Sequence, residues 1–224
     1  MPLTRFTPII DSYCTQPYIA IIANGEVPTS PLILEYLKGA TYLICCDGAI
    51  SYLEQNNITP TCIIGDCDSI SSTQLAKFAD IIIRRDNQNY NDLTKSIMFC
   101  TQEYPQINSI LIVGAFGLRE DHAIGNFSVI TEQSSAVLKL IALSDYGMFI
   151  SHHSKTSITY PALIGQQISF FANNAVLNCK ALKWQLQDYH INNLHQATLN
   201  QATNTYISVD SDSPILIYFA FCIK

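Results

Sequence analysis

Short apolar runs alternate with longer amphipathic or polar stretches over the first two thirds of the chain. Runs of this length that end at Gly, Asn or Asp are typical of buried strands. They predict strands at 18–23, 42–46, 62–64, 81–83, 109–113 and 138–143. The stretches between them predict helices at about 31–38, 50–57, 72–79, 92–101 and 120–133. Such alternation is typical of a mostly parallel sheet with helices on both faces.

The pattern changes after about residue 147. Short runs of β-type residues, separated by Gly, Pro, Asn and Ser, predict strands at 157–160, 167–171, 175–177, 205–209 and 215–221. We therefore expect an α/β fold with a three-layer α/β/α domain at 1–147 and an antiparallel β-sandwich at 148–224. The Asn- and Gln-rich stretch 185–204 is expected to form loops. Residues 1–17, which contain three prolines, are expected to form an arm or an edge strand.

Polar residues follow the predicted strands of the first domain. They cluster at 24–25, at 47, at 66–68, at 87–92 and at 119–122. Right-handed crossovers place the carboxyl ends of parallel strands on one edge of the sheet, where open α/β sheets bind their ligands. We therefore expect a binding site at this edge.

Asp66 and Asp68 are separated by one residue and follow a strand that ends at Gly65, which we interpret as the bend that aims them. Carboxylates this close repel each other unless a cation lies between them, and Mg²⁺ takes one or two carboxylates together with substrate phosphates. Asp92 is a candidate ligand of the same metal. The alternatives are a simple turn for the first pair and charge compensation at a helix N-terminus for Asp92. The spacing alone leaves these alternatives open.

A glycine-containing turn, 114–117, leads into a predicted helix. Such a turn offers backbone N–H groups to a phosphate, and the planar guanidinium of Arg119 could add two more donors. Polar side chains lie in the first turns of the same helix, namely Asp121, His122 and Asn126. Each could equally be an ordinary hydrogen-bonded helix residue. Similarly, Trp184 could be a core residue of the β-domain.

Composition excludes several classes of protein. Apolar residues make up 48% of the 224 residues, charged residues make up 13%, and the net charge is −6. The chain can bury a large core, and a nucleic-acid partner is not expected. The eight cysteines include no C-x-x-C pair, which argues against zinc, and we expect them to be thiols in a reducing cytoplasm. We expect no signal peptide, and no apolar run is long enough to suggest a membrane span.

Six short motifs occur in a fixed order over roughly residues 18–220. They are Cys46-Asp47-Gly48-Ala49, Gly65-Asp66-Cys67-Asp68-Ser69-Ile70, Asn87-Gln88 with Asn91-Asp92, Gly114 to Asn126, Gly165 to Phe171, and Leu182-Lys183-Trp184-Gln185-Leu186. Any one of them is common, whereas six in this order are specific. Together they resemble the motifs of the thiamine pyrophosphokinase family.

This resemblance implies an enzyme that transfers a pyrophosphoryl group from ATP to the hydroxyl of thiamine, with Mg²⁺ as the metal. It implies a homodimer with the active site at the subunit interface. The catalytic residues would be Asp47, Asp66, Asp68, Asp92 and Arg119, and the metal ligands Asp66, Asp68 and Asp92. The ATP site would use Gln88, Gly114, Gly117, Arg119, Asp121, His122 and Asn126. Trp184, Thr198 and Asn200 would bind thiamine.

Several residues depart from the family's pattern, and one of them is Leu118, which stands where Gly or Lys is frequent before the Arg. Asn87 stands where the family usually has Asp, Asn91 replaces Thr, and Leu199 replaces a hydroxyl-bearing residue near the expected thiamine site. They keep open a non-catalytic thiamine- or nucleotide-binding protein. The Asp-x-Asp pair after a strand also keeps open a Mg²⁺-dependent phosphatase of the haloacid dehalogenase type, in which the first Asp would be a covalent nucleophile.

Overall fold

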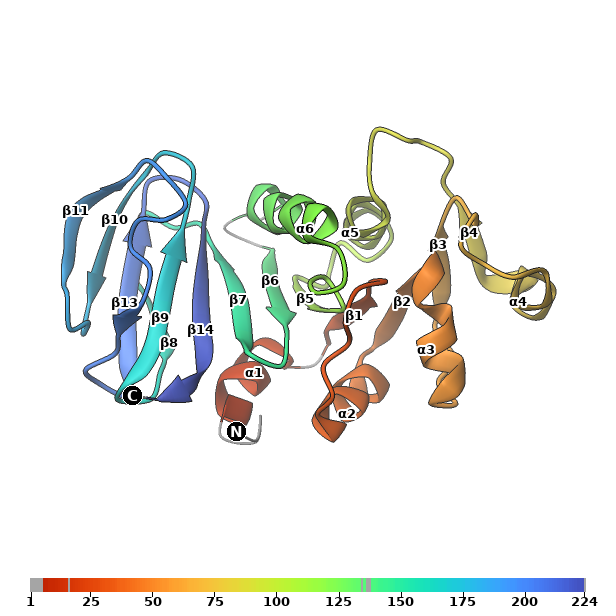
Figure 1. The fold of residues 1–224 in the computed structure, drawn as a ribbon, viewed down its shortest axis with the longest axis horizontal. Coiled ribbons are helices and arrows are strands. Elements are labelled where there is room, and N and C mark those ends of the chain that lie inside the picture. The colour runs from red at the N-terminus through yellow and green to blue at the C-terminus, as the bar shows by residue number, and fades with distance from the viewer. Residues whose placement is uncertain (1–5, 16, 134, 136–137, 224) are drawn as a thin grey trace. The chain divides into compact units, whose positions relative to one another are not determined.

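The computed structural model describes residues 6–15, 17–133, 135 and 138–223. The chain forms two compact units, which we describe in turn. One comprises Cys14–Val129, and the other comprises Met1–Tyr13 together with Ile130–Lys224. Figure 1 labels the elements of both units along the chain.

The unit Cys14–Val129 is built on a parallel sheet. Within the residues that the structure describes, its strands are β1 (Ile19–Ile22), β2 (Tyr42–Cys46), β3 (Cys62–Gly65), β4 (Ile82–Arg84) and β5 (Ser109–Val113). They lie in the order β5-β1-β2-β3-β4. Every residue of β1, β3 and β5 is buried. That burial on both faces is why these strands are continuous apolar runs in the sequence, and the predicted parallel sheet is confirmed.

Helices cover both faces of this sheet. They are α2 (Pro31–Gly39), α3 (Ile50–Gln55), α4 (Ser72–Lys77), α5 (Asp92–Glu103) and α6 (Glu120–Glu132), with short 3-10 helices η2 (Asp47–Ala49) and η3 (Ala79–Ile81). The crossovers from β1 to β4 all step in one direction, whereas the crossover through α5 steps back. Right-handed crossovers therefore place α2, α3 and α4 on one face, and α5 and α6 on the other (Figure 1).

The strand order reverses between β1 and β5, so the loops after these two strands leave the sheet side by side. Backbone hydrogen bonds join the loops, from Gly25 N–H to Gly114 O at 2.7 Å and from Glu26 N–H to Phe116 O at 2.8 Å. Gly114 has φ +69°, and a Cβ there would lie 2.3 Å from the carbonyl oxygen of Ala23. Glycine is therefore required at this reversal point, where open α/β sheets place their ligands.

The other unit is a β-sandwich with one helix, α1 (Thr7–Tyr13). Its strands are β6 (Lys139–Leu143), β7 (Gly147–His152), β8 (Ile158–Pro161), β9 (Gln166–Phe171), β10 (Ala175–Lys180), β11 (Leu186–Ile191), β12 (Asn200–Gln201), β13 (Tyr206–Ser211) and β14 (Ile215–Ile223). One antiparallel sheet has the order β12-β9-β14-β7-β6 and the second has the order β11-β10-β13-β8. The rings of Tyr160 and Phe219 meet between the two sheets, with centroids 6.4 Å apart. The predicted β-sandwich is confirmed.

Two predictions about elements of this unit are wrong. Residues 7–13 form a helix rather than an arm or edge strand, and its Ile9, Ile10 and Tyr13 are buried; residues 1–5 and 16 lie outside the described part. Pro8 is tolerated because it falls in the first helical turn, where the backbone N–H has no helical partner. The stretch 185–204, predicted as loops, contains β11 and β12. The register of β11 shifts against β10 and Asp188 has φ 45°, so an irregularity hides the alternation that marks a strand.

No helix in the described part of the chain combines the length and the apolar character needed to cross a membrane. No disulfide joins cysteines in the described part of the chain. Five cysteines lie within or beside the strands and helices of the parallel-sheet unit, namely Cys45, Cys46, Cys62, Cys67 and Cys100. They pack there as small apolar residues, and burial raises the pKa of the Cys46 thiol to about 12.

Candidate active site

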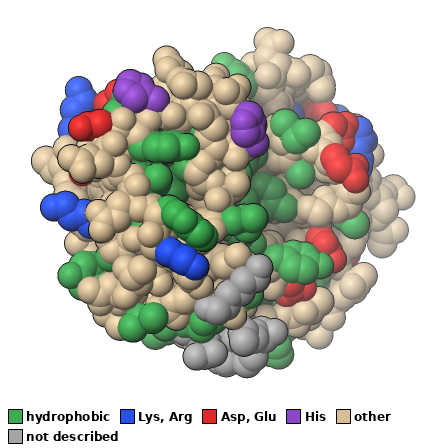
Figure 2. Space-filling model, turned by 60° about the vertical axis from the view of Figure 1, so that its left-hand side comes forward, with side chains coloured by type: hydrophobic (Ala, Val, Ile, Leu, Met, Phe, Trp, Pro, Cys, Tyr) green, Lys and Arg blue, Asp and Glu red, His purple; other side chains and the backbone are tan. Residues whose placement is uncertain are grey.

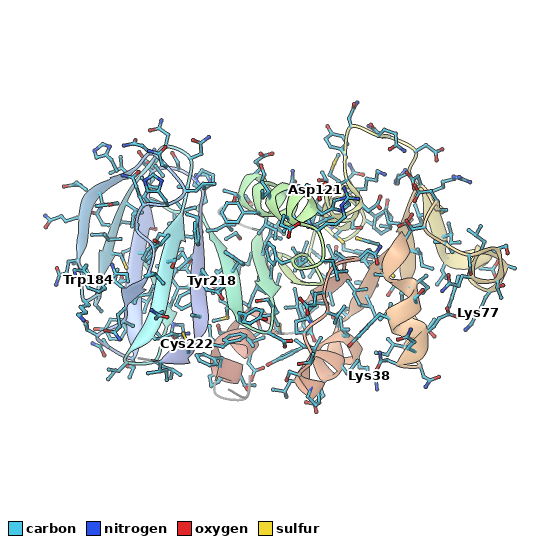
Figure 3. All side chains as sticks on the ribbon, in the orientation of Figure 1. Lys38, Lys77, Asp121, Trp184, Tyr218 and Cys222 are labelled. Carbon is cyan, nitrogen blue, oxygen red and sulfur yellow. The ribbon has the colours of Figure 1, made fainter. Side chains whose placement is uncertain are left out.

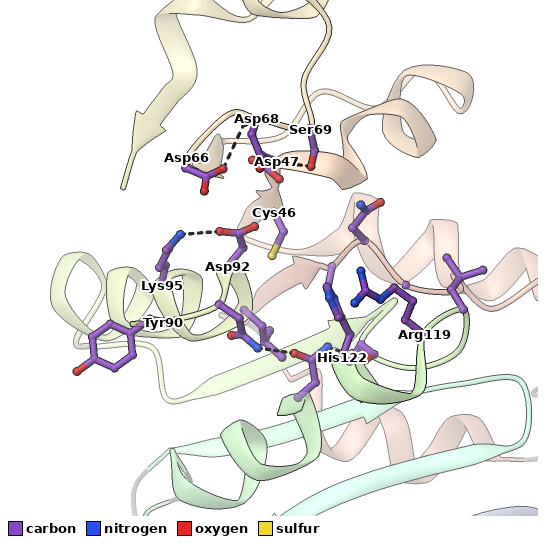
Figure 4. Close-up of a pocket in the computed structure, with 18 of the residues that line it drawn as sticks. Cys46, Asp47, Asp66, Asp68, Ser69, Tyr90, Asp92, Lys95, Arg119 and His122 are labelled. Atoms are coloured by element: carbon purple, nitrogen blue, oxygen red, sulfur yellow. Dashed lines mark hydrogen bonds and ion pairs between the residues drawn. The ribbon is translucent and has the colours of Figure 1, made fainter. Parts of the chain in front are cut away.

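A cavity of about 600 Å³ opens at the carboxyl edge of the parallel sheet (Figure 4). Residues from the loops after all five strands of this unit, and from the first turns of α5 and α6, line it. The five polar clusters that the sequence places after strands therefore meet in one cavity, as predicted. The cavity lies within the unit Cys14–Val129.

One wall of the cavity is acidic. Asp47, Asp66 and Asp68 each offer a carboxylate oxygen, and these oxygens lie within 4.8 Å of one another. Asp66 accepts hydrogen bonds from Gln88 Nε2 at 2.8 Å and from Asp68 N–H at 3.3 Å. The hydrogen bond from Gln88 is the main cause that lowers the pKa of the Asp66 carboxyl. Asp66 is thus held in its charged form beside two other carboxylates.

Asp47 lies deepest in this wall, with only 3% of its surface exposed. Its two oxygens accept hydrogen bonds from Gly48 N–H and Cys67 N–H. Burial raises the pKa of Asp47 to about 6, and the charge of Asp92 adds to this, while the two N–H donors act in the opposite direction. A carboxyl with this pKa exchanges protons near neutral pH.

Gly65 leaves the space that Asp47 occupies. A Cβ at residue 65 would lie 2.6 Å from Cγ and Oδ2 of Asp47. The interpretation of Gly65 as a bend is wrong, because it is the last residue of β3 and pairs with Arg84. The chain turns instead at Cys67, which has φ 70°. This left-handed conformation points Asp66 and Asp68 toward the cavity and aims the Cys67 N–H at Asp47.

A lysine faces the acidic wall from α5. Lys95 Nζ lies 3.0 Å from Asp92 Oδ1, and the Lys95 side chain is only 6% exposed although it lines the cavity. Figure 4 shows this pair opposite Asp66. The motifs in the sequence did not single out Lys95. The signal that could have found it is the spacing of three residues from Asp92, which brings both side chains to one face of the helix.

Arg119 and Asp121 form an exposed pair at the start of α6. Nε of Arg119 lies 3.0 Å from Asp121 Oδ1, and a terminal nitrogen lies 2.6 Å from Oδ2. The guanidinium holds the pKa of Asp121 at about 2. Asp121 also accepts the backbone N–H of His122 at 2.9 Å. The backbone N–H of His122 is therefore bound by a carboxylate, while Arg119 and His122 line the cavity.

Amide side chains hold the loops that line the cavity in position through hydrogen bonds. Asn126 Nδ2 donates to Ala115 O at 2.7 Å, and its Oδ1 accepts Asn91 Nδ2 at 2.9 Å. Asn91 caps α5 by accepting Thr94 N–H at 2.9 Å, which a Thr at this position would also do. Asn87 accepts Asn89 N–H at 2.9 Å, as an Asp would. The two departures in this loop therefore keep the local hydrogen bonds that the family's residues would make.

The acidic wall suits a hard divalent cation. It offers only carboxylate oxygens, which are the donors that Mg²⁺ prefers, and the cavity beside it leaves room for phosphate oxygens to complete the coordination. Burial is the main cause of the raised pKa of Asp47, and the charges of Asp92 and Asp66 raise it further; a bound cation would relieve that smaller, electrostatic part.

The residues predicted to bind thiamine lie in the sandwich unit. Trp184 is 57% exposed and is not a core residue; Figure 3 shows it beside β11. Asn200 is buried and clamps the Trp184 backbone, because its Oδ1 accepts Trp184 N–H at 3.2 Å and its Nδ2 donates to Trp184 O at 2.6 Å. The Asn200 side chain is thus occupied by the protein itself. Thr198 donates to His195 O at 3.2 Å.

Trp184 belongs to a group of exposed apolar side chains on this unit. The others include Tyr146, Ile158, Ile164, Leu194, Leu199 and Tyr206. Figure 2 shows apolar side chains among largely uncharged surface on the face that it presents. Leu199 has φ 60°, and its N–H donates to Ser169 Oγ at 3.0 Å, so its backbone is fixed while its side chain faces solvent. Lys183 Nζ lies 4.9 Å from the centre of the Trp184 ring, within cation–π range.

Two family models match the chain. The model described as thiamin pyrophosphokinase, catalytic domain, matches residues 33–142. The model described as thiamin pyrophosphokinase, substrate-binding domain, matches residues 147–218.

Relatives and solved structures agree with these matches. The chain is 25% identical to thiamine pyrophosphokinase 2 of Arabidopsis thaliana, over 92% of this chain and 87% of that protein. It is 33% identical to thiamine pyrophosphokinase 1 of Oryza sativa subsp. japonica, over 57% of this chain and 56% of that protein. The crystal structure of thiamine pyrophosphokinase from Bacillus subtilis has the same fold, with a TM-score of 0.73 at 19% identity, covering 91% of this chain and 98% of that one.

Proposed function

Since this chain belongs to the thiamine pyrophosphokinase family, we propose that it transfers the diphosphoryl group of ATP to the hydroxyl oxygen of thiamine, giving thiamine diphosphate and AMP. One observation carries the proposal beyond family membership. Four carboxylates and two cationic side chains from four separate strand ends line one cavity, where the strand order reverses. Phosphoryl transfer depends mainly on positioning and on charge neutralisation, and this arrangement supplies both.

Asp66, Asp68 and Asp92 are the residues that would hold Mg²⁺ against the phosphates of ATP. Asp47 lies beside Asp66 and Asp68, and each of its oxygens accepts one backbone N–H, which leaves a lone pair on each oxygen. The bound ion would draw charge from the phosphates and stabilise AMP as the leaving group.

The rest of the cavity would bind ATP. Arg119 can leave Asp121 and place its planar guanidinium on phosphate oxygens, because the pair is exposed to solvent. Of the residues that the resemblance suggests for ATP, Gln88, Gly117, His122 and Asn126 line the cavity, whereas Gly114 and Asp121 are not among its lining residues. Gly114 would act through the backbone of its loop and Asp121 through Arg119. Gln88 would act by orienting Asp66, and Asn126 by holding the loop after β5.

Asp47 is the carboxylate that we assign as acceptor of the proton from the thiamine hydroxyl. A general base works best when its pKa lies near the working pH, and burial together with the charge of Asp92 raises the pKa of Asp47 to about 6. Its position beside Asp66 and Asp68 would keep the proton transfer close to the metal and the phosphates.

Thiamine would stack on Trp184 through its flat, positively charged ring system. A cation on an indole ring contributes ~0.5–2 kcal/mol, depending on how far water is excluded. Thr198 and Asn200 would complete this half of the site, Asn200 by fixing the Trp184 backbone. The exposure of Trp184 supports a role in binding rather than in the core.

The family also suggests how the molecule is organised. Residues 1–147 would carry ATP and Mg²⁺, and residues 148–224 would carry thiamine and form a homodimer with the active site at the subunit interface. The break between the two family-model matches, after residue 142, supports this division. The free cysteines support a cytoplasmic location.

Product identification tests the proposal. The purified protein is incubated with thiamine, ATP and Mg²⁺, and the products are separated by chromatography. Thiamine diphosphate and AMP in equal amounts are expected. Free phosphate without AMP would indicate a phosphatase instead, and binding of thiamine or ATP without turnover would indicate a non-catalytic binder; either result would overturn the proposal.

A further inference from the structure

Resting on the proposed function, we propose that Lys95 is an exchangeable counter-ion. In the free protein its ammonium neutralises Asp92, and when Mg²⁺ and ATP bind it moves to a phosphate oxygen and releases Asp92 to the metal. Lys95 would then be both a competitor of Mg²⁺ in the free protein and a ligand of the nucleotide in the complex.

The Lys95–Asp92 pair is largely removed from solvent. Lys95 is 6% exposed at the side chain and Asp92 is 33% exposed, and Nζ lies 3.0 Å from Oδ1. Nearly complete burial of a lysine is unusual unless the ammonium is paired. Lys95 also lines the cavity, so it lies next to the space that a ligand would occupy.

The cavity holds more acidic than cationic side chains. Asp47, Asp66, Asp68 and Asp92 bring four acidic side chains. Of the cationic side chains that line the cavity in the described part of the chain, Arg119 is 68% exposed and bound to Asp121. Lys95 is therefore the buried cation in direct contact with the acidic group, and its charge also acts on Asp66, whose pKa it helps to lower.

The geometry of the pair allows the ammonium to move. Asp92 occupies the first position of α5 and Lys95 lies one turn later on the same face. A lysine has a flexible four-carbon stem that can redirect its ammonium without moving the helix. Figure 4 shows the pair facing Asp66, so a cation held between Asp66 and Asp92 would take the place of the ammonium, which could then turn to a phosphate oxygen.

The exchange predicts two effects of opposite sign for Lys95→Met. Without the internal competitor, Mg²⁺ alone should bind roughly threefold or more tightly. Without the ammonium in the complex, Mg²⁺ together with α,β-methylene ATP should bind roughly tenfold or more weakly. Both dissociation constants are measured by titration calorimetry on the full chain, so turnover is not needed.

Two variants serve as controls. Lys95→Arg keeps the positive charge. Whichever ligand the wild-type protein binds more tightly, Mg²⁺ alone or Mg²⁺ with the ATP analogue, should also be the one that this variant binds more tightly. Lys77 lies on α4 (Figure 3) and pairs with Glu54 at 2.8 Å. Lys77→Met should therefore change neither the dissociation constant of Mg²⁺ nor that of Mg²⁺ with the ATP analogue. Thermal unfolding of each variant establishes that it is folded under the titration conditions.

The outcomes separate this inference from the proposed function. Opposite shifts in Lys95→Met support the exchange. Equal weakening of both ligands, or no change in either, overturns the exchange while the wild-type protein still binds Mg²⁺ with the ATP analogue. Failure of the wild-type protein to bind the analogue at all would overturn the proposed function itself. If Lys95→Met does not fold, Lys95→Gln is titrated in its place and is subject to the same criteria.

Discussion

At the residue scale, the position of the Asp47 carboxylate depends on a side chain that is missing at Gly65. We predict that Gly65→Ala lowers turnover by roughly tenfold or more, because the added Cβ would lie 2.6 Å from the Asp47 carboxylate and must displace it. Turnover and thermal unfolding are measured together.

Gly125→Ala is the matched control for this substitution. A Cβ at residue 125 meets nothing within 4 Å, and the residue lies within α6. We expect this variant to remain active and to gain up to ~1 kcal/mol in stability, because alanine favours the helix over glycine. Wild-type turnover in Gly65→Ala would show that Asp47 does not need its observed position.

The clamp of Asn200 on Trp184 gives a second prediction at this scale. Asn200→Ala should raise the KM for thiamine several-fold and leave the KM for ATP unchanged, because it frees the Trp184 backbone and leaves its buried partners unsatisfied. Trp184 is the only tryptophan, so its fluorescence reports the site directly, and its quenching by thiamine should weaken. Asn204→Ala, in the same unit, should behave as wild type; equal thiamine KM values in both variants would contradict the clamp.

The sequence predicts the charged residues of the site better than the residues whose ion pairs and hydrogen bonds keep the site in position. Asp66, Asp68 and Asp92 follow strands, so their type and spacing place them at one edge of the sheet. Lys95 was missed because it lies outside the motifs, although its spacing of three residues from Asp92 on the predicted helix brings the two side chains to one face. The role of Asn200 was missed because its hydrogen bonds reach a segment sixteen residues away.

At the element scale, continuous apolar runs identify the parallel strands, and irregular elements of the sandwich are harder to predict. A buried parallel strand must be apolar on both faces, so β1, β3 and β5 are visible from composition alone. The strand β11 has exposed and buried residues in an irregular order, so no period of two appears. Helix α1 was missed because the three prolines of residues 1–17 suggested extended chain, although Pro8 falls in the one helical turn that accepts proline.

The packing of α1 and β8 on β7 buries a histidine and makes the sandwich unit sensitive to acid. His152 is 1% exposed, and its Nδ1 lies 2.7 Å from the hydroxyl of Tyr160, whose ring stacks on Tyr13 of α1. Burial lowers the pKa of His152 from 6.5 to about 4. The neutral ring is therefore favoured in the folded state, and its contribution is fully present above pH 6.5 and is lost as the pH falls toward 4.

We predict that this histidine alone costs about 3 kcal/mol of stability between pH 6.5 and pH 4. His152→Phe should flatten the fall in unfolding temperature over this range, because it removes the group that must be protonated. His153→Phe, at the neighbouring position, should keep the wild-type slope. Identical slopes in all three proteins would contradict the assignment.

At the scale of the whole molecule, the ATP half and the thiamine half of the proposed site lie in different compact units. If two subunits complete each site, mixing the impaired variants Asp68→Asn and Trp184→Ala, assayed at a low thiamine concentration, should give more activity than either variant alone. Random exchange of subunits would make half of the dimers mixed, each with one intact site, which gives about a quarter of wild-type turnover. No recovery after subunit exchange, verified by mass spectrometry, would show that each chain carries a complete site.

Asp68→Asn tests directly whether the acidic wall, formed by Asp47, Asp66 and Asp68, drives diphosphoryl transfer. The variant keeps the size of the side chain and removes its charge, and its matched control is Asp86→Asn, which removes an exposed carboxylate that pairs with Arg84. Formation of thiamine diphosphate is measured across a Mg²⁺ titration, together with thermal unfolding. We predict that Asp68→Asn loses turnover by roughly a hundredfold or more at every Mg²⁺ concentration while remaining folded, and that Asp86→Asn matches wild type. Wild-type turnover in folded Asp68→Asn would contradict the account.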